Sequence, residues 1–96
     1  MNNEISGMEI GLIERVGIAG IKVLIALFKK GELHIREIVR EAGMSYTSLY
    51  RALHDLLTLK LIEEEIREGK RIIRLTAKGK ELAELLMKAE ELLKKE

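Results

Sequence analysis

Two short amphipathic segments joined by a tight turn constrain the fold of this chain more than any other feature. The connection is Ala42-Gly43-Met44, in which glycine is the residue that favours a turn. In the second segment Leu49, Leu53 and Leu56 recur at i, i+4 and i+7, which is the spacing of one helix face. Polar side chains follow the same period on the opposite side: Thr47, Arg51, His54 and Thr58. The pattern predicts two helices that meet at a tight turn, with a polar face on the second.

The first helix of this pair is predicted to bury one side and expose the other. Its apolar residues share one face: Ile35, Ile38, Val39 and Ala42. Its charged residues lie outside: Arg36, Glu37, Arg40 and Glu41. His34 stands where an N-cap or first-turn residue is expected. Ser45 suits the N-cap of the second helix, because its hydroxyl can accept a hydrogen bond from the backbone of Thr47 or Ser48.

A β-hairpin is predicted after the helix pair. Residues 62–66 and 71–75 have the composition of strands and flank Glu68-Gly69. One register accounts for the pattern, with these pairs: Arg67 with Lys70, Glu63 with Arg74, and Ile62 with Leu75. It places four apolar side chains on one face: Ile62, Ile66, Ile73 and Leu75. It also gathers three cations at the tip: Arg67, Lys70 and Arg71.

The order of these pieces resembles a known family. The pieces are Gly43-Met44-Ser45, then Leu49, Arg51, Leu53 and Leu56, then Leu61-Ile62, Gly69-Lys70-Arg71 and Leu75-Thr76-Ala77-Lys78-Gly79. Over residues 18–80 they resemble the winged helix-turn-helix of bacterial and archaeal transcription regulators. They are similar to MarR-type and PadR-type repressors and their small archaeal relatives. The resemblance implies a mostly α fold with a small β-hairpin, the wing, which Leu33 pins as a single-residue strand.

The chain departs from these families where it leaves the second helix. The families often have glycine just before the Leu-Ile pair, and this chain has Lys60 before Leu61-Ile62. A residue other than glycine in the left-handed conformation costs about 1 kcal/mol. Either the exit from the helix has a different geometry or Lys60 tolerates the strain.

The resemblance implies a DNA-binding face on the second helix and the wing. Residues 45–59 would enter the major groove of double-stranded DNA, and the wing at residues 66–71 would reach the backbone or a minor groove. The expected DNA-binding residues are Ser45, Tyr46, Thr47, Tyr50, Arg51, His54, Arg67, Lys70 and Arg71. Arg51 is expected to bind guanine, because a guanidinium can bond O6 and N7 together. For the helix residues the alternative is an ordinary solvated face.

A long amphipathic helix is predicted to follow Thr76, which can cap it. Its apolar stripe is longer than a small core can cover: Leu82, Leu85, Leu86, Ala89, Leu92 and Leu93. We expect these residues to form a homodimer interface with the same helix, or with the N-terminal helix, of a second copy. The alternative is a helix folded back on its own domain.

The N-terminal third is predicted as two helices. The first spans residues 8–16 and is interrupted by Gly11, and the second is nearly all apolar and ends at Lys29-Lys30-Gly31. Between them Gly17-Ile18-Ala19-Gly20 is interpreted as a site of close helix packing. Gly69-Lys70 and Gly79-Lys80 lack the other residues of a phosphate loop and are interpreted as turns. The expected organisation is an arm or helix at 1–17, the winged helix-turn-helix at 18–76 and a C-terminal helix at 77–96.

Charge and composition leave several function classes open. The net charge is only +1, although residues 34–80 contain ten basic and seven acidic groups, a local excess of three. A protein–protein interaction module and a sequence-independent chromatin protein therefore remain alternatives to a sequence-specific regulator. No catalytic set or cofactor loop occurs, so we expect no enzyme and no cofactor. A small-molecule effector in a groove of the dimer is possible, and no residue identifies one.

The same composition bears on metals and on location. With no cysteine and two histidines twenty residues apart, no metal site is expected. The longest apolar stretch, residues 16–28, contains Lys22 and is shorter than the roughly 20 residues that a membrane span needs. We expect a cytoplasmic protein without membrane contact. The high content of Glu, Lys and Arg is typical of a thermophile, which suits the archaeal relatives.

Overall fold

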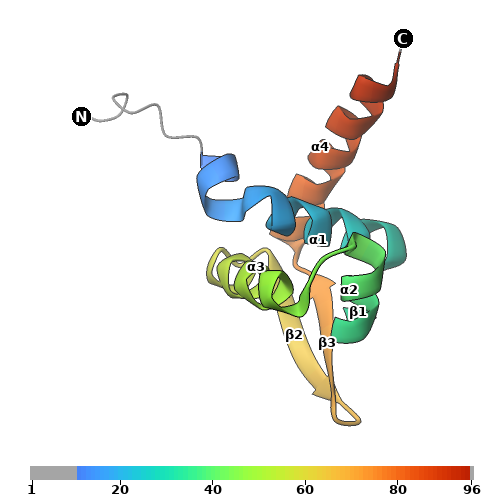
Figure 1. Ribbon diagram of the computed structural model, residues 1–96. Helices are drawn as coiled ribbons and strands as arrows, with labels where there is room; N and C mark the ends of the chain where they lie inside the picture. Colours follow the sequence, from blue (N-terminus) through green and yellow to red (C-terminus); the bar gives the residue numbers. More distant parts are fainter. Residues whose placement is uncertain (1–10, 96) are drawn as a thin grey trace, which may run out of the picture.

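The computed structural model describes residues 11–95, and its elements follow the predicted order. In chain order they are η1 (Leu12–Val16, a π-helix), α1 (Gly17–Lys30), β1 (Leu33–His34), α2 (Ile35–Ala42), α3 (Tyr46–Thr58), β2 (Ile62–Arg67), β3 (Lys70–Leu75) and α4 (Ala77–Lys94). The three strands form one antiparallel sheet in the order β1-β3-β2. The hairpin points away from the helical body, and α4 leaves it on the opposite side (Figure 1). The predicted winged helix-turn-helix fold is confirmed.

The leucine period of α3 is confirmed, since all three predicted leucines lie in the core. Leu49 and Leu56 are fully buried and Leu53 almost so. They share one cluster with Leu24 of α1 and Ile38 of α2. Burying a side chain of this size stabilises a fold by about 1.5–3 kcal/mol. This cluster therefore fixes which face of α3 is left to solvent.

The turn between α2 and α3 forms as the sequence predicts. Gly43 has φ +64°, the left-handed conformation that ends helices, and its amide donates to the carbonyl of Val39 at 3.0 Å. Ser45 is the N-cap of α3, and its hydroxyl accepts from the Ser48 amide at 3.1 Å. At the start of α2 the His34 amide donates to the Glu37 carboxylate at 3.0 Å. Both helix starts are thus capped by the expected residues.

The hairpin has the predicted register, from Ile62 opposite Leu75 to Arg67 opposite Lys70. Glu68 and Gly69 form its turn with φ values of +53° and +77°, as a two-residue hairpin turn of this kind requires. Leu33 of β1 pairs with Ile73 of β3, so the strand implied by the resemblance is present, and it has two residues, Leu33 and His34, rather than one. Ile66 shares the face of Ile73, but it lies beyond the core and is 65% exposed.

Lys60 tolerates the strain, which answers the question left by the sequence. Its φ is +60°, so the chain leaves α3 in the geometry that glycine usually provides. The Lys60 amide donates to Leu57 O at 3.0 Å, and its carbonyl accepts from the Thr76 hydroxyl at 2.8 Å. These bonds hold the residue in place at a conformational cost of about 1 kcal/mol.

One glycine was assigned wrongly. Gly79 lies in the first turn of α4 rather than in a turn of its own, and it is buried. An added Cβ there would lie 1.9 Å from the carbonyl oxygen of Leu61. Gly20 is also buried, and an added Cβ would lie 2.8 Å from Val16 Cγ1 and 3.5 Å from Leu56 Cδ2 of α3, which agrees with the predicted close helix packing. Of the predicted first helix, residues 8–10 lie outside the described part of the chain.

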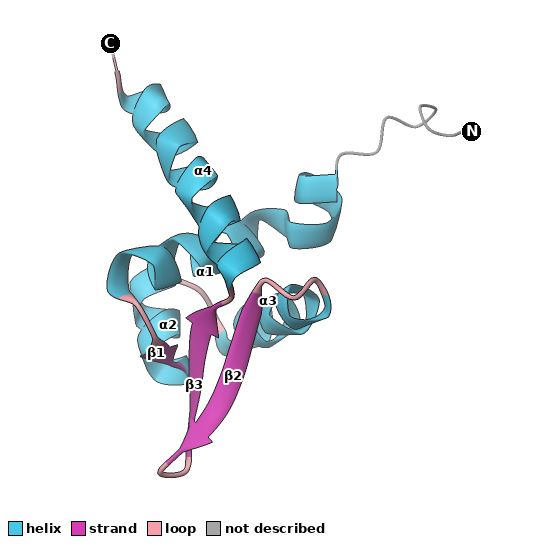
Figure 2. Ribbon diagram, turned by 180° about the vertical axis from the view of Figure 1, so that it is seen from behind, coloured by secondary structure: helices cyan, strands magenta, loops and turns pink. Residues whose placement is uncertain are grey.

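The apolar stripe of α4 is covered only along its first half. Ala83 is buried, and Leu82 and Leu86 pack against the core. Beyond them the helix projects from the body, as Figure 2 shows from behind, and Leu92 and Leu93 are 67% and 85% exposed. The helix does not fold back along its whole length, and the remainder of the stripe has no cover within residues 11–95.

Candidate nucleic-acid interface

The outer face of α3 carries the five helix residues that the sequence singled out. Tyr46 and Tyr50 are 45% and 49% exposed, with their ring centroids 6.3 Å apart. Thr47, Arg51 and His54 are also exposed. Arg51 has no ion-pair partner among the described residues. Hydroxyls, a guanidinium and an imidazole on one helix face can donate to or accept from base edges and phosphates.

The wing contacts this face through Arg71. Its guanidinium carbon lies 5.8 Å from the centroid of the Tyr50 ring, within the range of a cation–π contact. Its Nε donates to Glu64 at 2.9 Å. Arg71 therefore connects β3 to the middle of α3, and it adds a positive charge beside the exposed tyrosines. That charge is partly compensated by Glu64.

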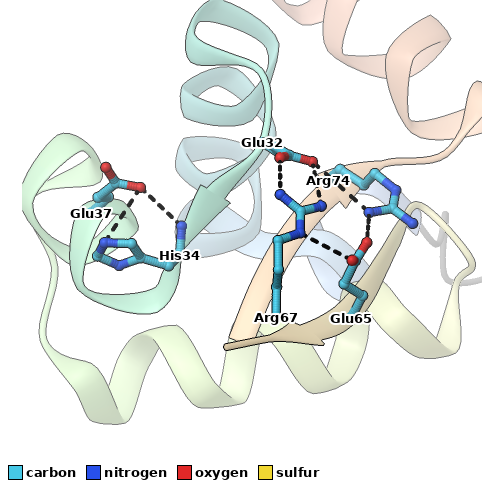
Figure 3. A network of polar contacts seen from close by, with 6 residues as sticks. All are labelled: Glu32, His34, Glu37, Glu65, Arg67 and Arg74. Atoms are coloured by element: carbon cyan, nitrogen blue, oxygen red, sulfur yellow. Dashed lines mark hydrogen bonds and ion pairs between the residues drawn. The ribbon is translucent and has the colours of Figure 1, made fainter. Parts of the chain in front are cut away.

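Arg67 is turned away from the recognition helix. Its guanidinium donates to Glu32 at 2.6 Å and to Glu65 at 3.1 Å, while Arg74 donates to Glu65 at 2.6 Å. Figure 3 shows these four side chains converging between the start of β1 and the hairpin. We call this set the wing network. It joins the hairpin to the segment before β1, 35 positions away in the sequence.

The ion pairs of the wing network shift the ionisation of its members. Hydrogen bonds from Arg67 and then Arg74 lower the pKa of Glu65 to about 2. The hydrogen bond from Arg67 lowers the pKa of Glu32, and the same carboxylates raise the pKa of Arg67. All these groups are exposed to solvent, so each ion pair contributes little to stability alone. Arg67 is held between two carboxylates and does not lie free at the wing tip.

Sequence reasoning missed Glu32, although a signal for it was present. Leu33 was expected to pair with the wing, and a residue next to that strand lies close to the base of the hairpin. Lys70, by contrast, is exposed at the tip as predicted. The expected residues therefore lie in three places: the α3 face with Arg71, the wing tip with Lys70, and the wing network with Arg67.

A family model described as "Sugar-specific transcriptional regulator TrmB" matches residues 19–78, which run from the start of α1 into the first turn of α4. The chain belongs to the TrmB family. The matched part contains α3, the wing and the turn between α2 and α3, so the family assignment rests on the same elements as the geometry. No curated protein sequence matches this TrmB-family chain significantly.

Several solved structures share the fold of this TrmB-family chain. BpsR of Bordetella bronchiseptica, whose DNA binding is regulated by 6-hydroxynicotinic acid, is 21% identical with a TM-score of 0.74, over 81% of this chain and 61% of that one. A MarR family regulator of Silicibacter pomeroyi is 23% identical with a TM-score of 0.71, over 82% and 54%. F-93 of SSV1 is 25% identical with a TM-score of 0.70, over 79% and 89%. The chain thus spans about six tenths of BpsR and about half of the MarR regulator.

The described helices are too short or too polar to cross a membrane. Within residues 11–95 no three side chains of His, Cys, Asp or Glu are grouped closely enough to hold a metal ion. The TrmB family and the MarR family structure from Silicibacter pomeroyi are described as transcriptional regulators. The outer face of α3 and the wing are accordingly the candidate functional surfaces of the described residues.

Proposed function

We propose that this protein is a homodimeric regulator that binds specific sequences of double-stranded DNA. The recognition helix, residues 45–59, enters a major groove, and the wing, residues 66–71, reaches the backbone or the adjacent minor groove. The observation that carries the proposal is the burial of the three α3 leucines, because it holds the polar face of α3 outward. The TrmB-family match over the same residues supports it.

The residues of this face have different tasks in the proposal. Arg51 reads a guanine, since its fork can bond O6 and N7 together and no carboxylate among the described residues holds it. The contacts to bases or phosphates come from Tyr46, Thr47, Tyr50 and His54. Ser45 is the N-cap of α3, where the backbone amides of the first turn can donate to a phosphate. Lys70 and Arg71 bind phosphates. Arg67 contributes through the wing network, by holding the hairpin at its angle to β1.

The homodimer is proposed from the exposed apolar side chains of α4. Leu85, Leu92 and Leu93 are exposed on one helix that projects from the body, together with Ala89. A second copy of α4, or of the N-terminal segment, would cover them and would add apolar burial to a small core. The two-fold axis would then place two recognition helices about one turn of DNA apart. In this organisation residues 18–76 bind DNA and residues 77–96 join the copies, and the dimer acts in the cytoplasm.

The test combines site selection with two substitutions. Selection from a random duplex pool should return a roughly palindromic site. Arg51→Ala should then weaken binding by roughly 1–3 kcal/mol and relax the preference at one base pair of each half-site. Lys70→Ala should weaken all sequences alike and reduce the salt slope by about one. Lys88→Ala, at an exposed position of α4, is the control and should change neither.

Three results would contradict the proposal. Equal losses on selected and random duplexes for Arg51→Ala would remove its reading role. Comparable affinity for unrelated duplexes, falling steeply with salt, would favour a chromatin protein instead. Absence of duplex binding at low salt would favour a protein-interaction module. This second candidate is supported by the glutamates that pair with Arg67, Arg71 and Arg74, because they partly neutralise the positive charge of the wing.

A further inference from the structure

A second group of cations lies outside the recognition helix, between α2 and the wing. A hollow of about 460 Å³ is lined by His34, Ile35, Arg36, Arg40 and Lys70. Arg36 and Arg40 are four residues apart and so share one side of α2, and Lys70 is the first residue of β3. The start of α2 lies beside the hairpin in both Figure 1 and Figure 2. We call this site the α2–wing hollow.

The cations of the α2–wing hollow differ from those of the rest of the wing. Arg67, Arg71 and Arg74 each have a carboxylate partner within 3 Å. Arg36, Arg40 and Lys70 are exposed and have no ion-pair partner within residues 11–95. Three like charges around one hollow repel each other, and an anion bound between them would offset that repulsion.

The carboxylates on α2 are engaged elsewhere. Glu37 accepts from the His34 amide at 3.0 Å and lies 3.7 Å from the His34 ring. Glu41 lies 3.9 Å from Lys30 of α1. Neither glutamate neutralises the arginines of the hollow. The hollow is therefore an uncompensated positive site that is shaped by two separate elements.

We propose that the α2–wing hollow receives the DNA backbone, with each of its three cations on a different phosphate, and is an electrostatic anchor of the complex. The guanidinium of an arginine can donate two hydrogen bonds to the oxygens of a phosphate, and Lys70 adds a positive charge from the other side of the hollow. The DNA backbone is favoured as the source because the starts of α2 and α3 and the hairpin all lie on the side of the molecule opposite α4 (Figure 1). The inference rests on the proposed function, because it takes DNA bound by α3 as given.

The experiment measures how duplex affinity depends on salt for the full chain. Each phosphate contact contributes about −0.9 to the slope of log K against log salt concentration. Arg36→Ala with Arg40→Ala should therefore reduce the slope by about 1.8 and weaken binding roughly 60-fold at 0.1 M salt. Both side chains are exposed, so circular dichroism should show an unchanged fold. Adding Lys70→Ala should reduce the slope by about 0.9 more.

A matched variant controls for net charge. Lys22→Ala with Lys29→Ala also removes two exposed positive charges from one helix, away from the hollow. It should leave the slope unchanged. If it lowers the slope as much as the Arg36 and Arg40 pair does, general attraction explains the effect and the inference is overturned.

Three further outcomes separate the possible failures. If the wild-type protein binds its duplex and Arg51→Ala relaxes specificity, but the α2 variant keeps the full slope, the inference fails and the proposed function stands. If the wild-type protein binds no duplex, both the inference and the proposed function fail.

Titration with inorganic pyrophosphate tests a free anion as the source. Saturable binding without DNA that depends on Arg36 and Arg40, together with an unchanged slope, would assign the hollow to a small anion and overturn the DNA assignment.

Discussion

Replacing Gly79 by alanine tests how α4 is attached to the winged helix. The Gly79 amide donates to the Thr76 hydroxyl at 3.0 Å, within the N-cap of α4. An ideal Cβ at this position would lie 1.9 Å from Leu61 O, 2.9 Å from Leu61 C and 3.3 Å from Leu75 Cδ2. Ordinary contacts of a Cβ begin at 3.4 Å. The start of α4 and the residue before β2 must therefore separate by about 1.5 Å, the difference between 3.4 and 1.9 Å.

The magnitude follows from what that separation breaks. Helix propensity alone favours alanine over glycine by about 1 kcal/mol. Leu61 cannot retreat easily, because its amide is bonded to Leu56 O at 2.9 Å and its carbonyl accepts from the Thr76 amide at 3.1 Å. Losing that second bond costs about 1 kcal/mol, and forced overpacking typically costs 1–3 kcal/mol. We expect Gly79→Ala to lower the free energy of unfolding by roughly 1–3 kcal/mol, against the sign that propensity predicts.

The assay is urea unfolding followed by circular dichroism at a fixed protomer concentration, since dimer formation would make stability depend on concentration. Gly11→Ala is the matched control. Gly11 has φ −55°, and among residues 11–95 a Cβ there would meet its nearest atom, Arg15 Cδ, at an ordinary 3.7 Å. This variant should be as stable as the wild type or up to about 1 kcal/mol more stable. A Gly79→Ala protein as stable as the control would refute the reasoning.

Three further predictions concern Lys60, Glu65 and the exposed end of α4. Lys60→Gly removes the left-handed strain at φ +60° and should raise the free energy of unfolding by up to about 1 kcal/mol in urea, and a decrease would contradict this account. Because the pKa of Glu65 falls from 4.5 to about 2 on folding, its stabilising effect should be present above pH 4.5 and lost as the pH falls towards 2. Glu65→Gln should flatten that acid limb, and an unchanged limb in pH-dependent thermal unfolding would argue against it. Leu92→Glu with Leu93→Glu should shift sedimentation from dimer to monomer without unfolding, whereas an unchanged dimer would exclude this part of α4 from the interface.

Sequence patterns that span a few residues were sufficient to predict the helices, the hairpin and the helix caps. The period of Leu49, Leu53 and Leu56 specified the buried side of α3, because a helix turns once every 3.6 residues whatever surrounds it. The hairpin register followed from the two-residue turn at Glu68-Gly69 and from the alternation of apolar side chains. The helix caps at Ser45 and Thr76 followed from short side-chain bonds within four residues.

Contacts between distant segments were decided only by the tertiary structure. The sequence grouped Arg67 with Lys70 and Arg71 at the wing tip, and only the packing of β1 against β3 brought Glu32 within 2.6 Å of Arg67. Gly79 was interpreted as a turn, because nothing near it in the sequence shows that the Leu61 carbonyl fills the space of its Cβ.

The sequence by itself therefore determined the helices, the hairpin and the face that each turns inward. The structure decided which charges are neutralised and which remain available to a phosphate, as in the α2–wing hollow. The physical reason is range. The buried face of a helix or strand follows from the spacing of apolar residues within a short stretch of sequence. An ion pair between distant segments needs two side chains that meet only after the whole chain has folded.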